Sequence, residues 1–168
     1  MFEGLMMKII TLLNPIKVQN LITVIIILIL LNIGITQTAS ATIINVPADY
    51  PTIQAAIDAA AISGDEIIVA PGTYTEAINF NGKAIYLHSS GGADVTTIDG
   101  TGLTTSVVTC VNGEQAGTIL EGFTVTGGIG TYNALYDVTV GGGMLNDGTS
   151  PAVIDCIFTN NTADGGAG

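Results

Sequence analysis

The sequence predicts an all-β protein built as a stacked array of short strand units, with one helix near its N-terminal end. Three observations lead to this prediction. The chain has 22 glycines among 168 residues, only 10% charged residues, and many Thr, Val and Ile, a composition that favours extended strands. Short apolar runs alternate with turn dipeptides after residue 64. Some of these segments also recur along the chain, as they do in repeat architectures.

One segment has the periodicity of an amphipathic helix. In residues 53–62 the apolar side chains recur at the i, i+3, i+4, i+7 spacing of a helix face. Thr52 is the expected N-cap and Gly64 the expected C′ residue. Because so short a helix is unstable alone, we expect it to cover the open end of the β structure. A lead-in strand is expected at residues 43–47.

The strands expected after the helix are short and separated by turns. They fall at residues 66–69, 77–80, 84–88, 95–98, 106–111, 118–125, 138–140 and 152–158. Dipeptides such as Pro71-Gly72 and Asn81-Gly82 supply the turn conformations between them. This pattern alone fits a sandwich, a barrel or a solenoid.

Self-similarity favours the solenoid. Residues 120–126 match residues 154–160 in type 34 positions later, and residues 141–144 are echoed by residues 165–167, 24 positions later. We therefore expect repeated circuits of about 20–25 residues with variable loops, each burying its apolar face on the next. Asn161 is expected at a sharp corner because Asn tolerates left-handed backbone, and stacked Asn side chains are expected to bond along the stack.

These motifs resemble a known group of proteins. Residues 51–57 (PTIQAAI), 64–67 (GDEI) and 71–76 (PGTYTE) look like the opening of right-handed parallel β-helix proteins of the pectin-lyase-like superfamily, and the resemblance covers about residues 43–128. Residues 158–167 (FTNNTADGGA) are similar to the repeats of polymorphic outer-membrane proteins. The resemblance implies a right-handed parallel β-helix with an N-terminal capping helix.

The N-terminus is typical of an export signal. Lys8 and Lys17 precede an apolar run at residues 21–31, and Ala39-Ser40-Ala41 forms a small-residue cleavage site. We expect cleavage after Ala41. The apolar run is short for a membrane span of about 20 residues, and an uncleaved anchor is the alternative.

The expected organisation is a signal peptide at 1–41, a lead-in strand and capping helix at 42–64, and incomplete β-helix coils at 65–168. The chain stops at Gly168 inside what resembles another turn, so we expect a C-terminally truncated fragment. A secreted or cell-surface location follows, with the outer membrane as one option. Membrane contact is expected only through the signal or a missing C-terminal anchor.

The net negative charge of the chain limits the classes of molecule that it can bind. The formal net charge is −11, and after residue 41 Lys83 is the only Lys or Arg against 13 Asp and Glu. Nothing in such a chain neutralises phosphates, so nucleic acid is excluded. Carbohydrate or another surface protein remains as the expected partner.

No complete catalytic set is present, and no catalytic, cofactor-binding or metal residue is expected. The superfamily that the chain resembles includes lyases, hydrolases and esterases that use carboxylate clusters, Ca²⁺ or a cationic base, but this chain has no Arg and a single His. Glu121 and Asp155 occupy equivalent places in the 34-residue repeat and are the carboxylate candidates for acid–base hydrolysis; the alternative is two solvated strand positions. Ca²⁺ could use aspartate oxygens, but none has the spacing of a dedicated loop.

Five further residues carry specific expectations. His88 ends an apolar strand and is expected to be structural. Tyr132 and Tyr136 lie in a long loop and are candidates for exposed contact. Cys110 and Cys156 could form a disulfide, but their apolar flanks favour two buried thiols.

Together these features predict a non-catalytic, exported β-helix module of a secreted or cell-surface, adhesin-like protein. The alternative is the N-terminal part of a polysaccharide lyase or hydrolase that acts on acidic polysaccharide, with its catalytic coils beyond Gly168.

Overall fold

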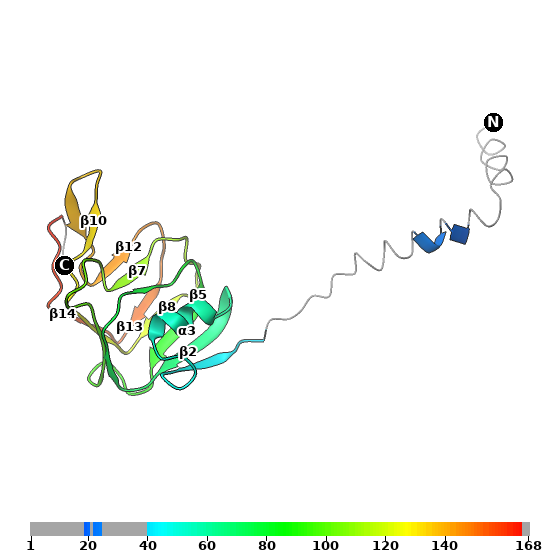
Figure 1. The fold of residues 1–168 in the computed structure, drawn as a ribbon, viewed down its shortest axis with the longest axis horizontal. Helices are drawn as coiled ribbons and strands as arrows, with labels where there is room; N and C mark the ends of the chain where they lie inside the picture. The colour runs from blue at the N-terminus through cyan, green and yellow to red at the C-terminus, as the bar shows by residue number, and fades with distance from the viewer. Residues whose placement is uncertain (1–18, 21, 25–39, 166–168) are drawn as a thin grey trace. The chain divides into compact units, whose positions relative to one another are not determined.

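The computed structural model describes residues 19–20, 22–24 and 40–165 (Figure 1). The first two short segments are helical. No helix within these three ranges is long and apolar enough to cross a membrane.

The chain divides into two compact units, residues 1–38 and residues 39–168. Most of the expected signal peptide, including Ala39, lies outside the described residues. Ala41 is described, and it is exposed and belongs to no helix or strand.

In the described part of the second unit, one helix and fourteen short strands follow one another. The elements are β1 (Ile43–Val46), α3 (Ile53–Ala59), β2 (Ser63–Val69), β3 (Gly72–Tyr74), β4 (Ile78–Asn79), β5 (Ala84–Ser89), β6 (Thr96–Asp99), β7 (Val108–Cys110), β8 (Ile119–Glu121), β9 (Thr124–Thr126), β10 (Thr131–Asn133), β11 (Val138–Val140), β12 (Met144–Asn146), β13 (Ala152–Ile154) and β14 (Ile157–Thr159). The prediction of an all-β protein with one N-terminal helix is confirmed for this part of the chain. Strand β2 begins inside the range 42–64 that we expected to hold the lead-in strand and helix.

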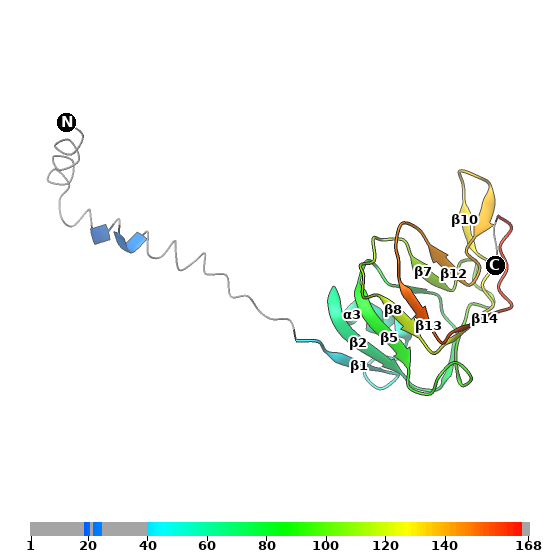
Figure 2. The same ribbon diagram turned by 180° about the vertical axis from the view of Figure 1, so that it is seen from behind.

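Three parallel sheets contain every described strand except β10 and β11. The first sheet has the order β1-β2-β5-β8-β13, the second β3-β6-β9-β14 and the third β4-β7-β12. The chain visits them in a repeated order: β2, β3 and β4 lie in the first, second and third sheets, and so do β5, β6 and β7. Strands of the first sheet that are far apart in sequence lie side by side in both views (Figures 1 and 2). Strands β10 and β11 form an antiparallel hairpin inserted between β9 and β12.

The register shows that successive circuits differ in length. Glu66 pairs with Tyr86, 20 positions later, whereas Tyr86 pairs with Ile119, 33 positions later. The expected 20–25 residues therefore describes the first circuits and not the later ones. Longer loops explain the difference, because they add length between strands without changing the pairing.

The 34-residue repeat is wrong by one position. Leu120 pairs with Val153, and Val125 pairs with Phe158, so both sheets repeat at 33 positions here. The 24-position glycine echo does not mark neighbours either. Gly165 instead donates its N–H to the carbonyl of Thr139.

Alternate residues of β1, β2 and β5–β9 point into one apolar core, as the two-residue period of a strand requires. Phe80 and Phe123 are its largest fully buried side chains. Val153 and Phe158 occupy positions in register with core residues, yet they are 43% and 41% exposed. None of the described residues adds a further strand beyond β13 and β14 in their sheets. The side chains of β13 and β14 at core positions are therefore left exposed.

Asn161 does not adopt the left-handed conformation that we expected of it. Its neighbour Asn160 does, with φ of 55°. The Asn161 amide instead joins two circuits: its Oδ1 accepts from the N–H of Gly128 at 2.9 Å, and its Nδ2 donates to the carbonyl of Val125 at 2.9 Å. The side chain therefore replaces the ladder bonds that are missing where the strand ends.

One pair of Asn side chains does bond along the stack. The Nδ2 of Asn112 donates to the Oδ1 of Asn79 at 3.1 Å. The two residues are 33 positions apart, so the bond connects neighbouring circuits as expected.

The start of α3 follows the prediction. Thr52 is the N-cap, with extended φ and ψ of −132° and 156°, and its hydroxyl accepts from the N–H of Ala55 at 3.1 Å. Glu76 caps the same end from outside the helix. Its carboxylate accepts from the N–H groups of Ile53 and Gln54, both at 2.9 Å.

The end of α3 differs from the prediction. The helix stops at Ala59, and Gly64 lies within β2, so it is not the C′ residue. Ala60 is already extended, with ψ of 151°, and the carboxylate of Asp65 accepts from the N–H of Ala61 at 2.7 Å. A carboxylate that holds this N–H removes it from the helical ladder and so favours the early stop.

Lys83 completes the helix end. Its Nζ donates to the carbonyls of Ile57, Asp58 and Ala60 at 2.7, 2.8 and 2.7 Å. These are carbonyls that a helix C-terminus leaves without intrahelical partners, and a cation also complements the negative end of the helix dipole. Helix α3 contacts β1, β2 and β4, and β1 and β4 are edge strands of their sheets.

Candidate functional site

Four polar side chains meet on the outward face of the first sheet. They are Glu66 of β2, Tyr86 and His88 of β5, and Glu121 of β8. Tyr86 and His88 alternate with the fully buried residues of their strand, so both point outward. The register sets Glu66 opposite Tyr86 and His88 opposite Glu121. We call these four residues the outer cluster.

The outer cluster is bonded diagonally across three strands. Nε2 of His88 lies 2.8 Å from Oε1 of Glu66, and the hydroxyl of Tyr86 donates to Oε2 of Glu121 at 2.7 Å. The rings of Tyr86 and His88 stack, with centroids 4.4 Å apart and planes at 20°. The hydrogen bond to Glu121, together with burial, raises the pKa of Tyr86 above its ordinary value.

The outer cluster contains groups that acid–base chemistry uses, but each one is bonded to a neighbour. A carboxylate beside an imidazole and a phenol beside a carboxylate are familiar proton donors and acceptors. Cross-strand pairs of this kind also stabilise a sheet by roughly 0.2–1 kcal/mol each. No group of three or more His, Cys, Asp or Glu in the described ranges is arranged to hold a metal ion.

The predicted equivalence of Glu121 and Asp155 is wrong. Glu121 pairs with Ile154, not with Asp155. Asp155 is an exposed corner residue with φ of 46°, one position later. Because a one-residue slip moves a side chain to the other face of a strand, the repeat places the two carboxylates in different settings. The other carboxylate of the outer cluster is Glu66, which strand β5 separates from Glu121 and which the sequence reasoning did not select.

Both cysteine thiols are free. Burial is the main reason that the pKa of the Cys110 thiol rises to about 12, and burial also raises the pKa of Cys156. The Sγ of Cys156 donates weakly to the carbonyl of Leu120 at 3.7 Å. These thiols are packing residues and not poised nucleophiles.

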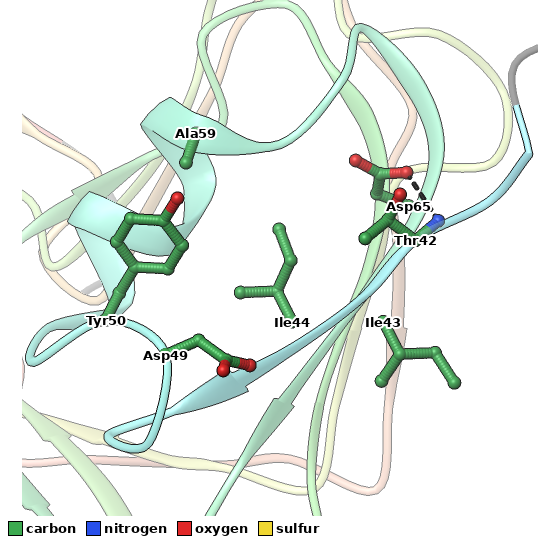
Figure 3. Close-up of a pocket in the computed structure, with 7 residues that line it drawn as sticks. All are labelled: Thr42, Ile43, Ile44, Asp49, Tyr50, Ala59 and Asp65. Carbon is green, nitrogen blue, oxygen red and sulfur yellow. Dashed lines mark hydrogen bonds between the residues drawn. The ribbon is translucent and has the colours of Figure 1, made fainter.

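An open hollow of about 400 Å³ lies beside α3 (Figure 3). It is lined by Thr42, Ile43, Ile44, Asp49, Tyr50, Ala59 and Asp65.

Both carboxylates of the hollow are held by the protein's own N–H groups. Asp65 accepts from Thr42 at 2.8 Å, and Asp49 accepts from Asn45 at 2.7 Å. The backbone bond from Asn45 lowers the pKa of Asp49. The hollow therefore offers carboxylates that already serve the fold.

The β10–β11 hairpin carries the two most exposed large hydrophobic side chains among residues 40–165, Leu135 and Tyr136, and Tyr132 is exposed beside them. Tyr132, Leu135 and Tyr136 are 60%, 80% and 69% exposed, which confirms the expectation that both tyrosines are accessible. The loop that we expected is in fact a paired hairpin. The hydroxyl of Tyr132 donates to Oδ1 of Asp137 at 2.9 Å.

Comparison with protein-family models, with curated proteins and with solved structures finds no match for this chain.

Proposed function

We propose that the chain is an exported, right-handed parallel β-helix that serves as a non-catalytic, adhesin-like module of a secreted or cell-surface protein. The observation that supports the fold is the repeated order of strands through three parallel sheets. A right-handed path is the expected one, because crossovers between parallel strands are right-handed in about 98% of cases. The motifs at residues 51–57 and 71–76 point to the same pectin-lyase-like superfamily.

The non-catalytic role rests on the position of the one strong cation. Lys83 is the only Lys or Arg after residue 41, and its ammonium is bonded to three carbonyls at the end of α3. A lyase or esterase of acidic polysaccharide needs positive charge against its substrate. This cation serves the fold instead, so a stiff scaffold that displays loops to carbohydrate or to another surface protein is the better account.

Export can be tested directly. We expect the chain expressed in a secreting host to leave the cytoplasm and to begin at Thr42 when its mass or N-terminal sequence is measured. An Ala39→Asp, Ala41→Asp variant should keep its full length, because the cleavage site requires small residues. Wild-type protein that stays cytoplasmic with residues 1–41 intact would reject the export part of the proposal.

The outer cluster is the observation that favours the alternative, a polysaccharide hydrolase or lyase. Glu66 and Glu121 share one face with His88 and Tyr86, and a pair of carboxylates is the usual catalytic set for glycoside hydrolysis. We expect no turnover when the chain is incubated with polygalacturonate, or with neutral polysaccharides. Turnover that disappears in both Glu66→Gln and Glu121→Gln would establish the enzyme and reject the non-catalytic module.

A further inference from the structure

The β10–β11 hairpin projects from the stacked scaffold, and its base is bonded to the scaffold: the hydroxyl oxygens of Ser106 and Thr131 lie 2.8 Å apart. It is the antiparallel pair among otherwise parallel described strands, and it stands apart from the three sheets in both views (Figures 1 and 2). Its tip, residues 132–137, exposes Tyr132, Leu135 and Tyr136 by 60% or more. Exposed aromatic side chains on a defined hairpin are typical of a contact surface, since Tyr is enriched at binding hot spots.

The hairpin and the segment beside it also carry exposed negative charge. Asp137 follows Tyr136 directly and is exposed. Asp164 lies against β11, where its main-chain N–H donates to Oγ1 of Thr139 at 3.0 Å, and it too is exposed. By contrast, Glu114 is buried and accepts main-chain N–H groups.

The bond between Tyr132 and Asp137 shapes the tip chemically. The phenol donates a hydrogen bond to the carboxylate, so electron density in the ring increases and the ring face becomes a better partner for a cation. Cations bind over tyrosine rings within about 6 Å of the centroid, with roughly 0.5–2 kcal/mol of stabilisation. The carboxylate beside the ring offers the same cation an ion pair.

We propose that the hairpin tip, residues 132–137, binds a cationic segment of a partner protein. An Arg or Lys side chain of the partner lies on the exposed rings and its charge meets Asp137, while Leu135 packs on the apolar stem. After residue 41 the chain has 13 Asp and Glu against one Lys. This negative charge steers a basic partner toward the molecule. This inference rests on the proposed display function, and it names the class of partner.

The test uses the full chain and a fluorescein-labelled oligo-arginine peptide, with affinity measured by fluorescence anisotropy at physiological salt. The double variant Leu135→Ser, Tyr136→Ser keeps the net charge, and we expect it to bind about 10-fold more weakly. The matched control is Ile62→Ser, which removes an apolar side chain that is 68% exposed outside the hairpin and should bind like wild type.

Two further variants keep the test independent of folding. Asp137→Asn should weaken binding about 3-fold through lost charge, and Asn tolerates the φ of 53° at this position. Tyr136→Phe keeps the ring and should bind like wild type. Circular dichroism that matches wild type shows that each variant is folded.

Equal binding by wild type and the double variant would overturn the proposal, because general charge attraction alone would then explain the affinity. Hairpin-dependent binding of maltoheptaose or of phosphatidylcholine vesicles, with none of the peptide, would overturn it in favour of a sugar or lipid partner. These outcomes differ from a failure of the proposed function. Cytoplasmic retention or polysaccharide turnover would reject that function and leave the peptide affinity of the purified chain unchanged.

Discussion

Lys83→Met should destabilise the protein more than any other single change at a polar residue that we consider. The lysine ammonium donates to the carbonyls of Ile57, Asp58 and Ala60 at 2.7–2.8 Å. Methionine keeps most of the apolar stem but has no donor, so three carbonyls at the end of α3 lose their partner together.

The expected loss follows from those three bonds. A hydrogen bond that involves a charged group contributes roughly 1.5–3 kcal/mol to stability, but three bonds from one ammonium are not additive. The bond to Asp58 is exposed, so water replaces part of the loss. We therefore expect the free energy of unfolding to fall by about 3 kcal/mol, which corresponds to a drop in Tm of roughly 10 °C for a domain of this size.

Urea denaturation followed by circular dichroism measures this change, with thermal melting as a second probe. Lys83→Arg is the matched control: it keeps the charge but presents a planar fork, so we expect an intermediate loss of about 1 kcal/mol. A methionine variant that unfolds within about 0.5 kcal/mol of wild type would refute the reasoning, because the carbonyls would then be equally well satisfied by water.

Three further predictions concern the cap, the outer cluster and metal binding. Ile57→Asp should unfold or aggregate the chain, since Ile57 is fully buried and a buried unpaired charge costs several kcal/mol. The control variant Ala59→Asp, on the exposed side of α3, should stay soluble. Identical behaviour of the two variants would contradict the placement of the helix. The hydrogen bond to Glu121 raises the pKa of Tyr86 in the folded protein. The stability that this bond adds is therefore fully present below the unfolded pKa of the tyrosine and is lost as the pH rises through the folded pKa. In Glu121→Gln, absorbance titration should show a lower midpoint for Tyr86, and an unchanged midpoint would exclude the bond as the cause. Adding Ca²⁺ should raise Tm only slightly, whereas a large, saturable rise would reveal a site.

Sequence reasoning was most successful where the cause is local. Thr52 could be selected as the N-cap because its side chain satisfies an N–H only three residues away. The β content followed from apolar runs bounded by turns, and these limits depend on neighbouring residues. The exposure of Tyr132 and Tyr136 followed from their place in a long segment between expected strands.

The same reasoning failed where distant residues decide the outcome. The sequence around the helix does not show that Lys83, more than 20 positions later, bonds the carbonyls at its end. The outer cluster was missed for the same reason, because Glu66 and Glu121 become neighbours of β5 only when three strands pair in register.

The sequence by itself determined the strand-rich character of the chain, the helix start, the acidic charge and the candidate export signal. These depend on composition and on interactions within a few residues. The tertiary structure alone decided the 33-position register, the bonding of Lys83 and the diagonal pairs of the outer cluster. Pairing between strands is non-local, and a shift of one residue changes which side chains share a face, so similar residue types at 33 or 34 positions could be distinguished only once the strands were paired.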